Sequence, residues 1–145
     1  MIKLFVGKKG SGKTKLLIDS ANEAIKKVKG HVVYVDYDNS HMFQIDYRVR
    51  FISTKEYTII DDEGFYGFIC GIIASNYDIE TIFIDGLYKI TRKDLLDLSN
   101  FFAKLDSLEM KYNVSFIFSV SYDSDELPEF LDKYTTVRLE DELKK

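Results

Sequence analysis

The segment GKKGSGKT at residues 7–14 constrains this chain more than any other feature. It matches G-x-x-x-x-G-K-[ST] at every fixed position, after an apolar run and before a helical pattern. Gly7, Gly10 and Gly12 let the backbone wrap around an anion, because glycine adopts positive φ without steric cost. The N-terminal end of the following helix adds a positive partial charge. The segment therefore predicts a phosphate-binding loop.

Two side chains of this loop have expected contacts with a nucleoside triphosphate. Lys13 carries a mobile positive charge that reaches the β- and γ-phosphates, and the Thr14 hydroxyl is a ligand for Mg²⁺. The expected cofactors are ATP and Mg²⁺, and ATP is favoured over GTP because the chain has no Asn-Lys-x-Asp motif for reading guanine. The residues expected to bind the nucleotide are Gly7, Lys8, Lys9, Gly10, Ser11, Gly12, Lys13 and Thr14.

Length and composition predict a single domain. The 145 residues suit one core, and 46% hydrophobic with 30% charged residues is typical of a globular chain. No apolar run approaches the roughly 18 residues of a membrane span, and no signal peptide is visible. The net charge of −4 disfavours indiscriminate binding to nucleic acids. We therefore expect one cytoplasmic nucleotide-binding domain over residues 1–145.

The rest of the chain alternates strand patterns with helix patterns. Apolar segments of strand length predict a mainly parallel sheet, and the amphipathic segments between them predict covering helices. The expected strands are residues 2–6, 31–35, 81–86, 114–121 and 135–139, and the expected helices are residues 13–29, 61–76 and 92–112. Residues 48–52 and 57–60 are further candidates for short edge strands. The predicted fold is a three-layer α/β/α sandwich around a mainly parallel five-stranded sheet.

An acidic residue, Asp85, ends the apolar strand that begins at residue 81. The carboxyl ends of parallel strands share one edge of a sheet, so Asp85 should emerge on the same edge as the phosphate loop. An apolar strand that ends in Asp is the Walker B pattern, in which the carboxylate holds Mg²⁺ through a water ligand. Asp85 is therefore expected to bind the metal together with Thr14.

Taken together, these motifs resemble the RecA/KaiC-like branch of the P-loop ATPases. The resemblance rests on residues 7–14, on the acidic end of the second strand in residues 35–38, and on residues 82–86 followed by a long helix and a strand. The phosphate loop is its specific part. The resemblance implies that the fourth strand lies between the strand before the phosphate loop and the strand that ends in Asp85. The strand count leaves open a nucleotide-kinase order, in which those two strands are adjacent.

The resemblance also implies a glutamate that orients the attacking water. In this chain Asp38 stands near one of the usual positions, and Gly86 follows Asp85 at the other. Asp is one methylene shorter than Glu, and a misplacement of about 1 Å can cost a large factor in rate, so we expect hydrolysis to be slow or partner-dependent. The expected catalytic residues are Lys13, Asp85 and Asp38. Further candidates for the carboxylate, the phosphate sensor and the arginine finger are Glu63, Ser119, Ser121, Arg92 and Arg138.

The sequence leaves three functions open. The first is a small ATP-binding protein with weak ATPase activity, acting as a switch or as a motor-type subunit that self-associates or joins a larger protein partner. The second is a nucleotide or small-molecule kinase, although residues 40–60 hold only Arg48 and Arg50 where a lid would need more arginines. The third is a catalytically inactive nucleotide-binding regulatory module.

Overall fold

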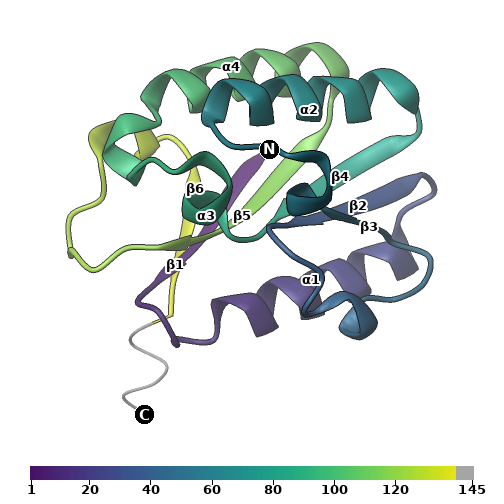
Figure 1. The fold of residues 1–145 in the computed structure, drawn as a ribbon, viewed down its shortest axis with the longest axis horizontal. Helices are drawn as coiled ribbons and strands as arrows, with labels where there is room; N and C mark the ends of the chain where they lie inside the picture. The colour runs from purple at the N-terminus through teal and green to yellow at the C-terminus, as the bar shows by residue number, and fades with distance from the viewer. Residues whose placement is uncertain (140–145) are drawn as a thin grey trace.

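The computed structural model describes residues 1–139 and has the α/β architecture predicted from the sequence. A parallel sheet forms the middle layer, and α1 (Lys13–Lys27) covers one of its faces (Figure 1). The other face is covered by α2 (Asp62–Ser75), α3 (Leu87–Thr91) and α4 (Ser99–Tyr112) (Figure 1). The three layers form the expected α/β/α sandwich.

Within residues 1–139 the sheet has six strands, one more than the five predicted. In the order β3-β2-β4-β5-β1-β6, every neighbouring pair is parallel. The strands are β1 (Ile2–Gly7), β2 (His31–Asp36), β3 (Arg50–Ser53), β4 (Ile79–Ile84), β5 (Ser115–Ser121) and β6 (Thr135–Arg138). The additional strand is β3, which confirms the candidate edge strand at residues 48–52.

The position of β5 decides how the ends of the strands are arranged. It lies between β1 and β4, which is the order that the resemblance implies and not the kinase order. The register pairs Phe5 with Ser119 and Ile84 with Phe118. The carboxyl ends of β1, β5 and β4 therefore meet at one edge of the sheet, beside the start of α1.

Side chains that alternate along the strands build one apolar core on each face of the sheet. Leu4 and Val6 point to the core beneath α2 and α4, whereas Phe5 points to the core beneath α1. On the α1 side, Leu17 and Ala21 are fully buried in the same cluster as the β-strand residues. The resulting helix–sheet contact fixes the direction in which α1 leaves the phosphate loop.

One predicted strand is wrong. Residues 57–60 contain no strand; the chain instead forms the 3₁₀ turn η2 (Thr54–Tyr57) directly after β3. Thr58 follows with φ 58°, in the left-handed region that interrupts extended backbone. The β-branched residues of this stretch suggested a strand, but they lie in the turn that leads into α2.

The helix predicted over residues 92–112 begins later than expected. Arg92, with φ 62°, ends the short helix α3, which the sequence analysis did not anticipate. The 3₁₀ turn η3 (Leu95–Asp97) follows, and α4 starts at Ser99. The other 3₁₀ turns of the described chain are η1 (Met42–Gln44) and η4 (Glu129–Leu131). Among residues 1–139, no helix combines the length and the apolar character that crossing a membrane requires.

Helix α2 contains two glycines, Gly67 and Gly71, at which an added Cβ would meet no heavy atom within 4 Å. Glycine inside a helix costs roughly 0.5–1 kcal/mol relative to alanine. Gly67→Ala is therefore expected to raise the free energy of unfolding by about 0.5–1 kcal/mol, measured by urea denaturation. The comparison variant is Gly86→Ala, at φ 78°, which should lower it by about 1 kcal/mol or more. A loss of stability in Gly67→Ala would contradict the helix geometry at that position.

Candidate functional site

The predicted phosphate loop starts where β1 ends at Gly7 and closes before the first turn of α1. Its closure is a hydrogen bond in which Ser11 N donates to Lys8 O at 3.0 Å. Gly10 and Gly12 have φ values of 82° and 94°, which other residues rarely adopt. No side chain of residues 1–139 caps α1 at Gly12. The start of a helix offers backbone N–H groups that can bind an anion.

Close approach within the loop also requires glycine at its first position. A Cβ on Gly7 would overlap the Ser11 hydroxyl and would lie 3.4 Å from Leu139 Cβ. Ser11 is itself buried, with 5% of its surface exposed, so it has little room to move away. Any side chain at position 7 would therefore force the buried Ser11 side chain to shift.

Lys13 lies folded over the loop. Its Nζ donates to Lys8 O at 2.8 Å and lies 3.5 Å from Ser11 Oγ. The residue is buried, whereas Lys8 and Lys9 are exposed beside it and Thr14 is half-buried in the first turn of α1. The eight residues predicted to bind a nucleotide thus span the end of β1, the connecting loop and the first turn of α1.

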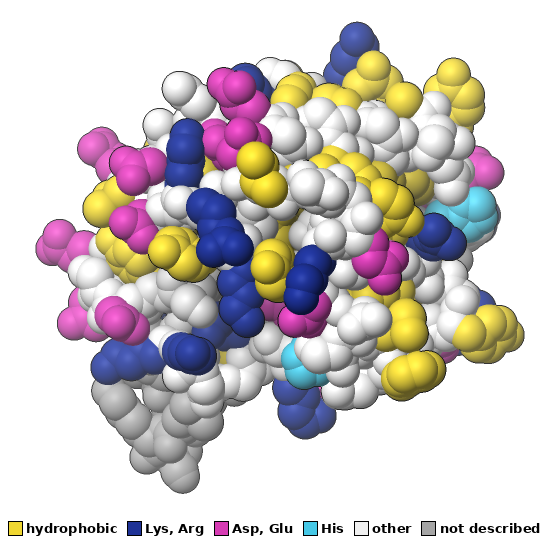
Figure 2. Space-filling view, in the orientation of Figure 1, with side chains coloured by type: hydrophobic (Ala, Val, Ile, Leu, Met, Phe, Trp, Pro, Cys, Tyr) yellow, Lys and Arg dark blue, Asp and Glu magenta, His cyan; other side chains and the backbone are white. Residues whose placement is uncertain are grey.

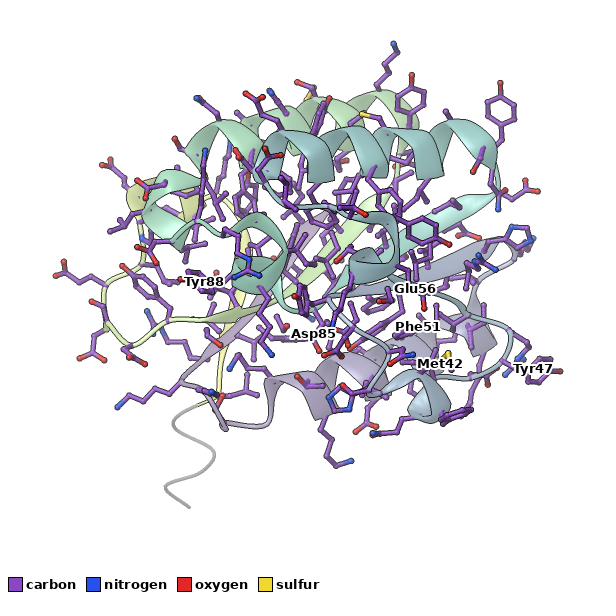
Figure 3. The ribbon with its side chains drawn as sticks, viewed as in Figure 1. Met42, Tyr47, Phe51, Glu56, Asp85 and Tyr88 are labelled. Carbon is purple, nitrogen blue, oxygen red and sulfur yellow. The ribbon has the colours of Figure 1, made fainter. Side chains whose placement is uncertain are left out.

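Asp85 follows β4 and is held from two sides. Tyr34 Oη donates to Asp85 Oδ2 at 3.1 Å, and Ser119 Oγ donates to Asp85 Oδ1. Burial, followed by the negative charge of Asp85, raises the pKa of Tyr34 well above its ordinary range, which keeps the hydroxyl protonated as a donor. Gly86, with φ 78°, then turns the chain into α3 (Figure 3). The two donors fix the carboxylate of Asp85 at the edge of the sheet.

A second buried carboxylate, Asp36, lies beside Asp85. The register pairs Val35 of β2 with Ile84 of β4, and the next residue of each strand is an aspartate. Asp36 has 6% of its surface exposed and Asp85 has 8%. Two adjacent strands therefore place two carboxylates side by side at the edge of the sheet where β1 also ends.

Asp36 has an oxygen without a partner. Its Oδ1 accepts a hydrogen bond from Tyr37 N at 2.7 Å, whereas Oδ2 is buried and has no hydrogen-bond partner within residues 1–139. Burial, together with the charge of Asp85, raises the pKa of Asp36 to about 7. A buried, unpaired carboxylate oxygen is unfavourable unless a ligand, a proton or a cation satisfies it.

Asp38, the predicted water-positioning residue, lies two residues after Asp36 and has different hydrogen-bond partners. It is half-buried, and its Oδ1 accepts hydrogen bonds from Ser40 Oγ at 2.8 Å and from Ser40 N at 3.1 Å. These hydrogen bonds lower the pKa of Asp38. Asp38 therefore stabilises the turn after β2, while Asp36 supplies the oxygen that lies beside Asp85.

The raised pKa of Asp36 predicts a pH-dependent stability. Between the ordinary pKa of 3.8 and about 7, the folded protein retains a proton that the unfolded chain has released, so stability falls as pH rises. Each pH unit in this window lowers the free energy of unfolding by about 1.4 kcal/mol. We expect Asp36→Asn to stabilise the protein at pH 8 by up to about 4 kcal/mol and to have little effect at pH 4. Urea denaturation at both pH values measures the difference.

Asp38→Asn is the matched control for this experiment, because the pKa of Asp38 is lowered and its hydrogen bonds are made to Ser40. It should not stabilise the protein at pH 8. An equal effect of Asp36→Asn at pH 4 and pH 8 would show that the Asp36 carboxylate carries no penalty from burial.

The other candidates from the sequence lie in varied surroundings. Ser119 contacts Asp85, whereas Ser121 is exposed at the end of β5, opposite Gly7 in the register. Arg138 donates to the backbone oxygens of Ser124 and Asp125 at 3.4 and 2.6 Å. Ser119 is therefore the candidate sensor that touches the acidic pair, and the guanidinium of Arg138 is engaged by a loop.

Glu63 lies away from the acidic pair. It occupies the first turn of α2, on the face of the sheet opposite α1 (Figure 1). There it lines a surface cavity of about 420 Å³ between α2 and α4 that also includes Asp62 and Lys93. Within residues 1–139, no cluster of three or more His, Cys, Asp or Glu side chains forms a metal site made of protein ligands alone.

Sequence reasoning missed Asp36 and Tyr34 as parts of this site. The available signal was the equal position of Asp36 and Asp85, each directly after a run of buried strand residues. Tyr34 gave no signal, because a tyrosine within an apolar strand is usually a core residue. No protein-family model matches the chain, and no curated protein matches it in a sequence comparison.

Proposed function

We propose that this protein binds Mg-ATP at residues 7–14 and hydrolyses it slowly or with the help of a partner, as a switch or motor-type subunit. The observation that carries the proposal is the juxtaposition of the glycine-rich loop, at the uncapped start of α1, with Asp85 at the same edge of the sheet. A self-associating or larger protein assembly in the cytoplasm is the setting that we propose for it.

The residues of the site fit ATP and Mg²⁺. Gly10 and Gly12 have positive φ and an added Cβ would meet nothing within 4 Å at either, which suits an exposed loop whose backbone contacts a phosphate directly. Thr14 and Asp85 would hold the metal, Asp85 through a water ligand, and the unpaired Asp36 Oδ2 offers an acceptor for a metal-bound water. Bound Mg²⁺ would offset the charge that develops on the phosphate oxygens during transfer.

The side chains of the chain would then have distinct roles. Lys13 leaves Lys8 O and orients the β- and γ-phosphates, which is a short movement for a flexible ammonium group. Ser119 and Tyr34 keep Asp85 in one orientation. Asp36 Oδ2 is the better-supported acceptor for the attacking water, because Asp38 Oδ1 is engaged by Ser40. The role of Asp38 in the reaction stays a prediction.

The arginines of residues 40–60 and the strand order support hydrolysis over phosphoryl transfer to a small acceptor. Arg48 forms a two-point ion pair with Asp46, through Nε at 3.0 Å and Nη2 at 2.9 Å, and Arg50 is exposed at the start of β3. The strand order, in which β5 separates β1 from β4, differs from the kinase order. The two alternative functions, a kinase and an inactive nucleotide-binding module, are therefore distinguished by the test below.

The test follows the fate of the γ-phosphate. Purified protein is incubated with γ-labelled ATP and Mg²⁺, with and without a mixture of nucleoside monophosphates, and products are separated by chromatography. Release of inorganic phosphate that is lost in Asp85→Ala supports the proposal. Label in a nucleoside diphosphate indicates a kinase, and ATP binding without any product over many hours indicates the inactive module. An absence of ATP binding at millimolar concentration would overturn the proposal.

A further inference from the structure

The segment between β2 and β3 presents two aromatic side chains to solvent. Phe43 is 93% exposed and Tyr47 is 92% exposed. Figure 3 shows Tyr47 at the right-hand end of the molecule, pointing away from it. Exposed aromatic rings are the side chains on which protein interfaces depend most. This segment is therefore a candidate interaction surface.

The backbone that carries the two rings is firmly held. In α1, Asn22 Nδ2 donates to Gln44 O at 2.9 Å, and Asn22 Oδ1 accepts from Asp46 N at 2.8 Å. Ile45 and Val49 are buried in the core beneath α1. The rings thus project from a fixed segment, so ordering it on binding a partner would cost little.

Two arginines extend the same surface. Arg48 is exposed and forms its ion pair with Asp46 within the segment. Arg50, the first residue of β3, is exposed and forms no ion pair with any residue from 1 to 139. Together these side chains make the surface that we call the aromatic end: Met42, Phe43, Tyr47, Arg48 and Arg50.

The opposite edge of the sheet, at β6, carries the complementary charge. Residues 123–132, between β5 and β6, contain five carboxylates and no Lys or Arg. All five are exposed, and none forms an ion pair within residues 1–139. Figure 2 shows acidic side chains at the left of the molecule and apolar ones at the lower right, toward Tyr47. We call these five residues the acidic end: Asp123, Asp125, Glu126, Glu129 and Asp132.

The acidic end is also held in place and has apolar surface between its charges. Arg138 donates to the backbone oxygens of Ser124 and Asp125 at 3.4 and 2.6 Å. Leu127 and Phe130 are half-buried among the carboxylates and pack against the core beneath α2 and α4. This end therefore offers both an acceptor for a guanidinium group and apolar surface for a ring.

We propose that the aromatic end of one copy of this protein binds the acidic end of a second copy. Arg48 and Arg50 would pair with the carboxylates, and the two rings would pack on Leu127 and Phe130. The two ends cannot meet within one chain, because five strand spacings of about 4.8 Å separate β3 from β6. A contact between different surfaces leaves one free end of each kind, so it extends into a ring or a filament.

The contact uses no residue of the predicted phosphate loop. It therefore gives the self-association of the proposed function a surface, but it does not depend on nucleotide binding. Association should occur without ATP and should persist in Lys13→Ala.

The experiment measures the mass of the full chain by sedimentation equilibrium over a range of concentrations, without nucleotide. The aromatic-end variant carries Phe43→Ala and Tyr47→Ala, and the acidic-end variant carries Glu126→Lys and Glu129→Lys. Each variant is measured alone and in an equimolar mixture of the two. Wild type is also measured at salt concentrations of about 0.1 M and 1 M, where the Debye length is about 10 Å and 3 Å.

The control variant carries Tyr77→Ala and Asp78→Lys. Tyr77 is 96% exposed and Asp78 is exposed beside it, in the turn before the central strand β4. The control therefore removes an equally exposed ring and reverses a charge away from both edge strands. Thermal melts show that every variant is folded.

We expect wild type to associate more weakly at high salt than at low salt, because charges face each other across the contact. Each end variant alone should have a dissociation constant raised at least about tenfold, as when interface anchors are truncated. Their mixture should form a dimer and nothing larger, since it contains one intact aromatic end and one intact acidic end for each pair. The control should match wild type.

Three results would overturn the proposal. A wild type that stays monomeric up to about 1 mM would assign the aromatic end to a different partner. Association that neither variant weakens would place the contact elsewhere. A mixture that stays monomeric, while each variant alone has lost association, would show that the two ends do not bind each other. Absence of ATP binding with association intact would overturn the proposed function alone.

Discussion

Replacing Lys13 with alanine is expected to abolish the Mg²⁺-dependent stabilisation of this protein by ATP. A ligand at 100 times its dissociation constant adds about 2.7 kcal/mol to the free energy of unfolding. In a domain of this size, each added kcal/mol raises the melting temperature by roughly 2–8 °C. If the variant binds ATP about 100-fold more weakly, the same concentration adds only about 0.4 kcal/mol. Thermal melts with and without ATP and Mg²⁺ measure the loss.

Lys15→Ala provides the matched control. Lys15 lies two residues further along α1 and is exposed, and its ion pair with Asp19 at 3.2 Å is at the surface. This variant should keep the full stabilisation by ATP. Retention of the full effect in Lys13→Ala would count against the loop as the phosphate site, because Lys13 is the side chain that lies folded over it.

Phe102→Ala is expected to cause the largest loss of stability. Phe102 is fully buried in α4, and its ring contacts four other aromatic rings at centroid distances of 5.1–5.9 Å. These neighbours are Phe101, Phe118, Phe130 and Tyr134. Truncation of a buried Phe costs about 3–5 kcal/mol. Because natural domains are stable by only about 5–15 kcal/mol, the variant should be close to unfolding at physiological temperature.

Met110→Ala on the same helix controls for helix propensity, since Met110 is 81% exposed. It should change stability by less than about 0.5 kcal/mol. Urea denaturation measures both variants. The result also bears on the site, because Phe118 lies in β5 directly before Ser119, which holds Asp85. A loss below about 1 kcal/mol in Phe102→Ala would show that this cluster does not support β5.

The buried strands were predictable from the sequence because they are long apolar runs with sharp ends. Strand β3 was harder to recognise, since its four residues start with the exposed Arg50 and only Ser53 is buried. The strand predicted at residues 57–60 failed because local composition does not reveal a left-handed residue such as Thr58. Short edge elements depend on tertiary contacts more than on their own pattern.

The break between α3 and α4 was also hidden from sequence reasoning. Leu95 and Leu98 fit the apolar spacing of a helix that starts at residue 92, and both are indeed buried. They are buried through the turn η3 and the residue after it, not through a continuous helix. Periodicity identifies which side chains face the core, but it does not decide whether the backbone between them is helical.

The site was predictable as far as it depends on local sequence. The predicted phosphate loop is continuous in the chain, so its motif can be recognised from local sequence, and its role stays a prediction. Asp36 and Asp85 are far apart in sequence and become neighbours only through the register of β2 and β4. Asp38 drew attention because it is nearer to the family position, whereas burial distinguishes Asp36.

The pairing of β1 with segments late in the chain has a consequence for how the protein is made. Among residues 1–139, the strand partners of residues 2–7 are β5 and β6, which lie in the last third of the chain. At about 5–20 residues per second, translation separates these partners by on the order of ten seconds. During that time the phosphate loop has no sheet to hold it, and the pairing that completes it is among the most distant in the sequence. A nucleotide would therefore stabilise only a nearly complete chain, which couples ligand binding to the final step of folding.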